Sequence, residues 1–250
     1  MRVITNFLGW TRFVIVFASM VPFTAVFLLV QVVLWLFRAR KVNRLFAYYT
    51  LSWISRCLVR GQGVSVSVKG LEHIPKDQGV VFMVNHQEFS DILLCYGYLK
   101  TPMAMVAKKE LGYIPGLSMY MRSLECYMLD RKNPKQALAL FEKARKRIQE
   151  EQYSALIYPE GTRSRGPKNR DFMVGASRIA YLAQASIIPV TISGSWKAGI
   201  YIKQIGGKKH IDIVVHPLVD IKDYPNDKKQ ELMAHVQQAV ESGFTDANKA

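Results

Sequence analysis

Short apolar runs alternate with amphipathic stretches through most of the chain. Residues 64–68 alternate strictly between valine and serine, which predicts a strand with one buried face. Other short apolar runs predict strands at 80–84, 103–107, 127–129, 155–158, 187–192 and 210–215. Longer stretches with helical period predict helices at 92–99, 109–123, 133–150, 172–185 and 227–241. This order predicts an α/β fold, with a mixed sheet flanked by helices.

A long uncharged segment precedes this part. Residues 13–37 carry no charge, and as a helix they would extend about 37 Å, enough to cross the hydrocarbon layer of a membrane. The segment either spans the membrane once or breaks near Pro22 and re-enters one leaflet. Residues 42–59 either form an amphipathic helix at the membrane interface or pack on the domain as an ordinary helix. We therefore expect membrane-anchoring helices over residues 1–62 and an α/β domain over residues 63–250.

Charge supports a membrane or phosphate partner. The formal net charge is +15, and residues 1–60 contain eight Arg or Lys and no Asp or Glu. These cations flank the apolar segment, and the four directly after it, Arg38, Arg40, Lys41 and Arg44, outnumber Arg2 and Arg12 before it. We therefore expect the domain to lie in the cytoplasm, at an anionic inner-membrane surface. No nucleic-acid-binding motif accompanies them, so we expect no nucleic-acid partner. The three cysteines lack metal-ligand spacing, so we expect neither a metal nor a cofactor.

The clearest candidate chemistry follows the strand at 80–84. His86 lies where that strand ends, and Asp91 lies five residues later, where the next helix begins. A histidine in the turn can meet an aspartate in the first helical turn, and the helix N-terminus stabilises the carboxylate. A carboxylate on one imidazole nitrogen fixes the tautomer and leaves the other nitrogen free as a general base. The alternative is a capping aspartate with an incidental histidine.

Further motifs favour the catalytic interpretation. Tyr158-Pro159-Glu160-Gly161-Thr162-Arg163-Ser164 follows the strand at 155–157. With Asn85-His86-x4-Asp91, it resembles motifs of the glycerolipid acyltransferase family, most closely its bacterial lysophosphatidic acid acyltransferases. Two further motifs of that family fit in order: Lys108-Lys109-Glu110-Leu111, Ile114-Pro115 and Leu129-Asp130-Arg131, and then Ile187-Ile188-Pro189-Val190. The resemblance covers roughly residues 64–219.

The resemblance implies an enzyme of phospholipid biosynthesis. It would transfer a fatty acyl group from acyl-CoA or acyl carrier protein to the sn-2 hydroxyl of 1-acyl-sn-glycerol-3-phosphate, giving phosphatidic acid directly, without an acyl-enzyme. His86 would act as the base and Asp91 would hold its ring. The acceptor phosphate would contact Lys108 or Lys109 and Arg163, with Arg131 contributing indirectly.

The other residues of the motifs have expected places in the same site. Asn85, Gly161 and Thr162 are expected in the substrate site, with Gly161 supplying a tight turn. Glu160 is expected to orient Arg163 or backbone groups around Gly161. The run 163–170 has four cations in eight residues. It would bind the phosphates of the donor or lipid headgroups, or it is a solvated basic loop.

Three positions depart from the family pattern. Met173 stands where a lysine is common, and Glu125 and Ser118 replace common glycines. These changes bear on the shape of the acceptor or acyl pocket. The alternatives are therefore acylation of another lysolipid, such as a lysophospholipid or lyso-ornithine lipid, a non-catalytic membrane-associated lipid-binding protein, and, most remotely, a hydrolase that uses Ser90.

Overall fold

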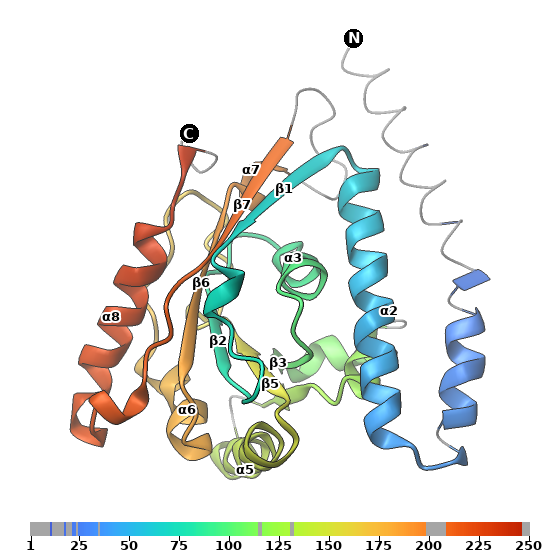
Figure 1. Ribbon diagram of the computed structural model, residues 1–250, viewed down its shortest axis with the longest axis horizontal. Coiled ribbons are helices and arrows are strands. Elements are labelled where there is room, and N and C mark those ends of the chain that lie inside the picture. The colour runs from blue at the N-terminus through green and yellow to red at the C-terminus, as the bar shows by residue number, and fades with distance from the viewer. Residues whose placement is uncertain are drawn as a thin grey trace.

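A single sheet organises the protein. The computed structural model describes residues 11, 18, 22, 23, 25–34, 36–114, 117–130, 133–198 and 209–246. Within these residues a seven-stranded sheet has the order β1-β7-β6-β2-β5-β3-β4 (Figure 1). Its strands are β1 (Val64–Lys69), β2 (Val81–Val84), β3 (Met103–Lys108), β4 (Tyr127–Leu129), β5 (Ser154–Ile157), β6 (Ile187–Ser193) and β7 (Lys209–Val215).

The strand directions make the sheet mixed, as predicted. β2 pairs in parallel with both β5 and β6, and β3 continues the parallel set between β5 and β4. β7 runs antiparallel to β6 and parallel to β1. In the register, Met83 of β2 lies beside Ile157 of β5 and Pro189 of β6. The carboxyl ends of β2 and β5 therefore lie side by side, where ligands commonly bind in α/β sheets.

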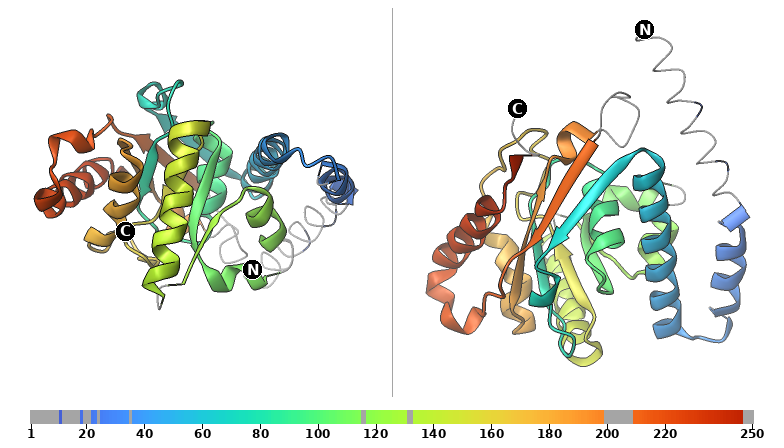
Figure 2. Two further views of the ribbon diagram at one scale, coloured as in Figure 1. Left: turned by 90° about the horizontal axis from the view of Figure 1, so that it is seen from below. Right: turned by 45° about the horizontal axis from the view of Figure 1, so that its top comes forward.

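Helices cover both faces of the sheet (Figures 1 and 2). The α-helices are α2 (Arg40–Gly61), α3 (Asp91–Tyr98), α4 (Leu117–Ser123), α5 (Pro134–Glu151), α6 (Arg178–Ala183), α7 (Ser195–Ala198) and α8 (Lys229–Ser242). Short 3-10 helices are η1 (Leu71–His73), η2 (Lys109–Tyr113), η3 (Val174–Ser177), η4 (Ile221–Asp223) and η5 (Asn226–Lys228). Figure 1 shows α2 and α3 on one side of the sheet, and α5, α6 and α8 on the other.

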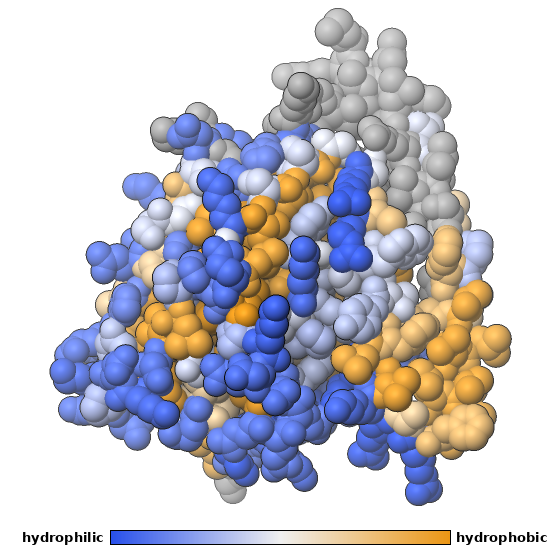
Figure 3. Space-filling model, in the orientation of Figure 1, coloured by the Kyte–Doolittle hydropathy of each residue, from blue (hydrophilic) through white to orange (hydrophobic). Residues whose placement is uncertain are grey.

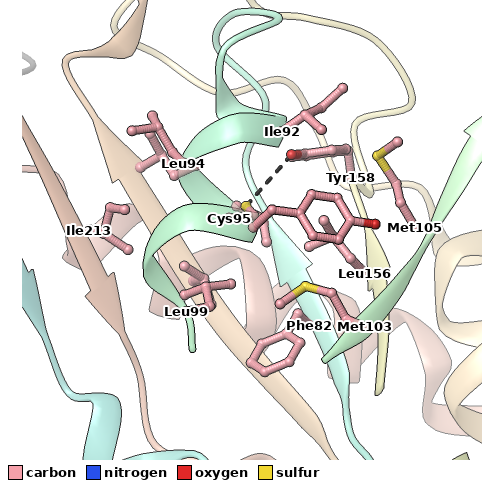
Figure 4. Close-up of a cluster of buried hydrophobic side chains, with 14 of the residues drawn as sticks. Phe82, Ile92, Leu94, Cys95, Leu99, Met103, Met105, Leu156, Tyr158 and Ile213 are labelled. Atoms are coloured by element: carbon pink, nitrogen blue, oxygen red, sulfur yellow. Dashed lines mark hydrogen bonds between the residues drawn. The ribbon is translucent and has the colours of Figure 1, made fainter. Parts of the chain in front are cut away.

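The core lies in two layers because side chains alternate along each strand. In β2, Phe82 and Val84 join the cluster under α3, whereas Val81 and Met83 join the cluster under α5, α6 and α8. All four residues are buried, which explains why this strand reads as a continuous apolar run. The cluster under α3 is drawn in Figure 4, where Phe82 lies with Leu99 and Met103.

Two predicted helices are shorter than expected. The helix predicted over 109–123 is divided into η2 and α4, because Ile114 is extended at φ −80° and ψ 116°. Pro115 follows it, and a residue before proline is disfavoured in helical conformation. The helix predicted over 172–185 likewise consists of η3 and α6, and it ends at Gln184 in the left-handed region.

The N-terminal segment lies partly outside the described residues. Of residues 1–21, only 11 and 18 are described. Residues 25–34 are helical, and the buried ring of Phe27 stacks on Phe46 and Tyr120, with centroids 5.5 and 4.3 Å away. In the part of the chain that is described, no helix is both long and apolar enough to cross a bilayer. The span expected over residues 13–37 falls partly on residues outside the described part and stays a prediction.

Helix α2 packs on the domain with one face. Ala47 and Tyr48 are buried toward α3, while Tyr49 and Trp53 remain exposed on the outer side. The buried face agrees with the helix packed on the domain that is one of the two alternatives for residues 42–59, and the position at a membrane interface stays a prediction.

Buried ion pairs also attach α2 to the domain. Arg44 of α2 donates to Glu125 at 2.9 Å and pairs with Glu151 at the end of α5. Arg147 of α5 pairs with the same Glu125 carboxylate and donates to the Glu125 carbonyl at 2.9 Å. Glu125 has a φ of 54°, in the left-handed region that favours glycine. Its side chain is thus held by two arginines on a backbone conformation that a glycine would adopt more easily.

Candidate active site

The turn after β2 brings the predicted pair together. His86 Nδ1 lies 2.8 Å from Asp91 Oδ2. Asp91 is the first residue of α3 and is fully buried, whereas the His86 side chain is 14% exposed. Because a carboxylate accepts, Nδ1 carries the proton of this hydrogen bond. His86 Nε2 makes no hydrogen bond to the described residues and remains available as a proton acceptor.

Asp91 also organises the turn that carries His86. The backbone N–H groups of Gln87 and Glu88 donate to Asp91 Oδ2 at 2.7 and 2.8 Å. One carboxylate oxygen therefore accepts from the imidazole and from two backbone groups. These bonds compensate for the burial of the charge and fix the ring relative to the start of α3.

Glu160, which follows β5, binds the backbone of the turn after β2. Its Oε1 accepts from the backbone N–H of His86 at 2.6 Å, and its Oε2 accepts from that of Arg170 at 2.8 Å. Burial raises the pKa of this carboxyl, while the two backbone donors oppose that shift. The expected role in orienting backbone groups is therefore visible, but the groups belong to His86 and Arg170 and not to the turn at Gly161. Arg163 is held by another acid.

That acid is Glu88. Arg163 Nη1 donates to Glu88 Oε1 at 3.4 Å, and both side chains are about one third exposed. The expected tight turn at Gly161 is present, because its N–H donates to the Tyr158 carbonyl at 3.0 Å and its φ is 67°. Sequence spacing could not identify Glu88 as the partner, since 75 residues separate it from Arg163.

Asn85 and Gln87 connect the catalytic turn to β6. Asn85 exchanges two hydrogen bonds with the backbone of Ile192, at 2.9 and 2.7 Å. Gln87 Oε1 accepts from the N–H groups of Gly194 and Ser195 at 3.2 and 3.1 Å. Both side chains are fully buried. The Asn85 amide thus bonds within the protein, and the substrate contact expected for Asn85 stays a prediction.

An aromatic ring supports the imidazole. Tyr158 stacks on His86 with centroids 4.1 Å apart and an interplanar angle of 20°. Its hydroxyl lies 3.6 Å from the sulfur of Cys95 on α3, and Figure 4 shows this contact inside the apolar cluster. Burial raises the pKa of both the Tyr158 hydroxyl and the Cys95 thiol. Both groups therefore stay neutral, and neither is a nucleophile at neutral pH.

A cavity of about 360 Å³ opens beside His86. Its polar lining consists of residues named by the sequence motifs, namely His86, Lys108, Gly161, Thr162 and Arg163. Its apolar lining includes Phe89, Ile92, Met105 and Leu111. A second cavity of about 120 Å³ shares Lys108, Tyr158 and Gly161 and extends toward Leu129, Phe141 and Met173. The site thus combines a base, two cations and an apolar wall.

The two adjacent lysines differ in environment. Lys108 lines both cavities and lies 3.3 Å from Glu110. Lys109 lines neither, and its ammonium binds Asp130, which raises the pKa of Lys109. Of the two lysines, only Lys108 lines these cavities, whereas the phosphate contact itself stays a prediction. Arg131 lies outside the described residues.

Ser90 is poorly placed for chemistry. It is fully buried, and its hydroxyl makes no hydrogen bond to the described residues. A hydrolase would need this oxygen exposed and bonded to a base. No group of three metal-ligating side chains occurs in the described part either. The arrangement can remove a proton from a hydroxyl beside two cations and an apolar cavity.

Comparisons with known proteins agree with this geometry. The model of the family described as Acyltransferase matches residues 65–193. A 1-acyl-sn-glycerol-3-phosphate acyltransferase from Borreliella burgdorferi is 31% identical over 180 residues, covering 71% of each chain. The protein of the same name from Escherichia coli is 27% identical and covers 68% of each chain. The crystal structure of the 1-acyl-sn-glycerophosphate (LPA) acyltransferase PlsC from Thermotoga maritima superposes with a TM-score of 0.75, at 25% identity over 97% of each chain. The chain belongs to the acyltransferase family.

Proposed function

We propose that this protein transfers a fatty acyl group from a thioester to the sn-2 hydroxyl of 1-acyl-sn-glycerol-3-phosphate, giving phosphatidic acid for phospholipid biosynthesis. The observation that carries the proposal is the His86–Asp91 pair beside a cavity that also exposes Lys108 and Arg163. The relatives named above as 1-acyl-sn-glycerol-3-phosphate acyltransferases support the choice of acceptor.

In the proposed mechanism, His86 Nε2 removes the proton of the acceptor hydroxyl as its oxygen attacks the thioester carbonyl. The imidazolium that forms is stabilised by the Asp91 carboxylate, which already accepts from Nδ1. The tetrahedral intermediate collapses, and the thiolate leaves with the proton held by His86. Oxygen displaces sulfur directly, so no acyl-enzyme is needed.

The acceptor phosphate binds between Lys108 and Arg163 in this proposal. Both line the larger cavity, and each already has one acidic neighbour, Glu110 or Glu88. A phosphate oxygen would satisfy the remaining donors of the Arg163 guanidinium, which suits a planar fork. The apolar part of the lining, with Phe89 and Leu111, is available to a fatty chain.

The proposal assigns the enzyme to the cytoplasmic face of the inner membrane, with residues 1–62 as the anchoring part and residues 63–250 as the catalytic domain. Large exposed apolar side chains support membrane contact, and in Figure 3 they gather over the N-terminal helix at the lower right. They include Val26, Leu29, Val33, Leu36 and Phe37. The basic residues Arg38, Arg40 and Lys41 follow directly and suit anionic headgroups.

The test is labelled acyl transfer by the detergent-solubilised full chain. Wild type is assayed with a long-chain acyl-CoA and with the same acyl group on acyl carrier protein, using lysophosphatidic acid as acceptor. His86→Ala is expected to lose about 10²–10⁴-fold in kcat or more, because a positioned base is removed. Ser90→Ala is the matched control, since its hydroxyl has no partner to lose.

Each outcome has a defined meaning. Phosphatidic acid from wild type and Ser90→Ala, but not from His86→Ala, supports the acceptor and the base. Acylation of another lysolipid alone would retain the mechanism and reject the acceptor. Transfer to no lysolipid would reject the enzymatic proposal.

A further inference from the structure

The basic loop, residues 163–170, contains three cations that the proposed mechanism does not use. Arg163 lines the cavity and pairs with Glu88. Arg165, Lys168 and Arg170 are exposed, and their side chains make no ion pair or hydrogen bond with the described residues. One acid, Asp171, directly follows them. The loop therefore presents a local excess of positive charge next to the mouth of the site.

This loop is held in place by its backbone. Ser164 N–H donates to the carbonyl of His86 at 2.7 Å, and Arg165 N–H donates to that of Gln87 at 3.2 Å. Arg170 N–H donates to Glu160 at 2.8 Å, and the Glu160 carboxylate also holds His86. A freely solvated basic run would not need such anchoring. The Glu160 carboxylate that bonds to the His86 backbone thus also holds the backbone from which these cations extend.

The outer end of the loop lies against α8. The Asn169 side chain donates to Glu241 at 3.1 Å, and Phe172 N–H donates to Gln237 at 2.9 Å. Figures 1 and 2 show α8 on one flank of the molecule and the described N-terminal helix on the opposite flank. The exposed apolar side chains suited to a membrane are on that helix. The three free cations therefore lie away from it, which favours a ligand from the aqueous side over lipid headgroups.

The reaction supplies a ligand with this chemistry. An acyl thioester of either donor is carried on a phosphopantetheine arm, so the thioester and the phosphate lie at opposite ends of one flexible chain. When the thioester carbonyl is beside His86, the phosphate must lie outside the cavity. Lys108 and Arg163, inside it, are already assigned to the acceptor. A second phosphate therefore requires separate cations close to the cavity mouth.

We infer that Arg165, Lys168 and Arg170 bind the phosphate of the acyl donor's phosphopantetheine arm, and so position the thioester at His86. This inference rests on the proposed acyl transfer and adds a donor site to it. The side chains are exposed, so the attraction is partly screened by salt, and each contributes modestly. Together they are expected to change donor affinity by about tenfold.

The experiment compares the full-length triple variant Arg165→Gln, Lys168→Gln, Arg170→Gln with wild type. Three donors carry the same acyl chain: CoA, acyl carrier protein and N-acetylcysteamine, a thioester without phosphate. The variant is expected to show about a tenfold higher KM for the first two. The rate with the N-acetylcysteamine thioester and the KM for lysophosphatidic acid should not change. The difference from wild type should shrink as salt is added.

A matched control removes three exposed cations elsewhere, Lys146→Gln, Arg178→Gln and Lys222→Gln, from α5, α6 and η4. Equal effects in both triple variants would overturn the inference, because net charge alone would explain them. An equal loss with the phosphate-free thioester, or a higher KM for lysophosphatidic acid, would also overturn it.

Comparison of the CoA thioester with the acyl carrier protein thioester distinguishes the sources of the phosphate. A rise with both donors assigns the loop to the shared phosphopantetheine phosphate, as inferred. A rise with only one donor would overturn the shared site and leave a contact with that carrier alone. Binding of free CoA to His86→Ala, measured by calorimetry with and without the loop substitutions, does not require turnover. Loop-dependent CoA binding without acyl transfer by wild type would reject the proposed function but retain the phosphate site.

Discussion

The Tyr158 ring lies flat against the imidazole of His86, with centroids 4.1 Å apart and planes inclined by 20°. Asp91 holds the edge of the same imidazole through Nδ1. The imidazole is thus restrained in two directions, by a residue directly after β5 and by the first residue of α3. Its remaining nitrogen, Nε2, is the atom assigned to proton removal.

Substitution of Tyr158 tests whether this stack positions the base. Tyr158→Phe keeps the ring and loses only the contact with Cys95, so kcat should stay close to wild type. Tyr158→Leu removes the stack and should lower kcat about tenfold, since such aromatic pairs contribute about 0.5–1.5 kcal/mol. Steady-state kinetics across pH, with KM measured separately, give the result. An unchanged kcat and pH profile in Tyr158→Leu would contradict the positioning role.

Substitutions at Lys108 and Arg163 test the acceptor phosphate site. Lys108→Met and Arg163→Met should each lower kcat/KM for lysophosphatidic acid by about 10–150-fold, because hydrogen bonds to charged groups are worth about 1.5–3 kcal/mol. The adjacent Lys109→Met is the control, since Lys109 binds Asp130 outside the cavity. A larger loss in Lys109→Met than in Lys108→Met would mean that the assignment is reversed.

The pKa of His216 predicts a loss of stability in acid. Burial, aided by nearby His73, lowers the pKa of His216, so the folded protein binds this proton less tightly than the unfolded chain does. The contribution is complete above the unfolded pKa of about 6.5 and is lost as pH falls toward the lowered value. In His216→Gln, the difference in Tm between pH 7.5 and pH 5.5 should be smaller than in wild type. An unchanged difference would exclude His216 as the cause.

Glu125 allows charge and backbone contributions to be separated. Glu125→Ala leaves the buried Arg44 and Arg147 without their shared, half-buried carboxylate, and it should lower the free energy of unfolding by up to about 3–5 kcal/mol. Glu125→Gly loses the same carboxylate but adopts the left-handed φ of 54° without a Cβ. The glycine variant should therefore be about 1 kcal/mol more stable than the alanine variant, as urea denaturation can measure. Equal stabilities would mean that the backbone at Glu125 is not strained.

Local patterns in the sequence predicted much of the fold. The alternation at 64–68 and the apolar run at 80–84 correspond to β1 and β2, because strand period and burial are properties of neighbouring residues. The predicted contact between His86 and Asp91 is also local, and it is present. The break before Pro115 follows from the proline itself, although the helical period around it predicts one continuous helix.

Hydrogen-bond partners that lie far apart in the sequence could not be predicted from local patterns. The bond from Glu160 to the backbone of His86 joins residues 74 apart, and the bonds of Asn85 reach 107 residues along the chain. No periodicity links such positions, and backbone groups carry no sequence signal. The motif therefore marked Asn85 and Glu160 as important, whereas only the packed strands reveal that both act on the backbone.

These distant bonds also bear on how the protein is made. His86 and Asp91 are synthesised close together, but the backbone N–H groups that donate to Gln87 Oε1 belong to Gly194 and Ser195, 107 and 108 residues later. A chain that ends before β6 contains Asp91, Tyr158 and Glu160, but it lacks the bonds of Asn85 and Gln87 that attach the histidine turn to the end of β6. The turn that carries the histidine is therefore attached to the sheet only once β6 has been added, so its final position depends on the last third of the domain as well as on its own motif.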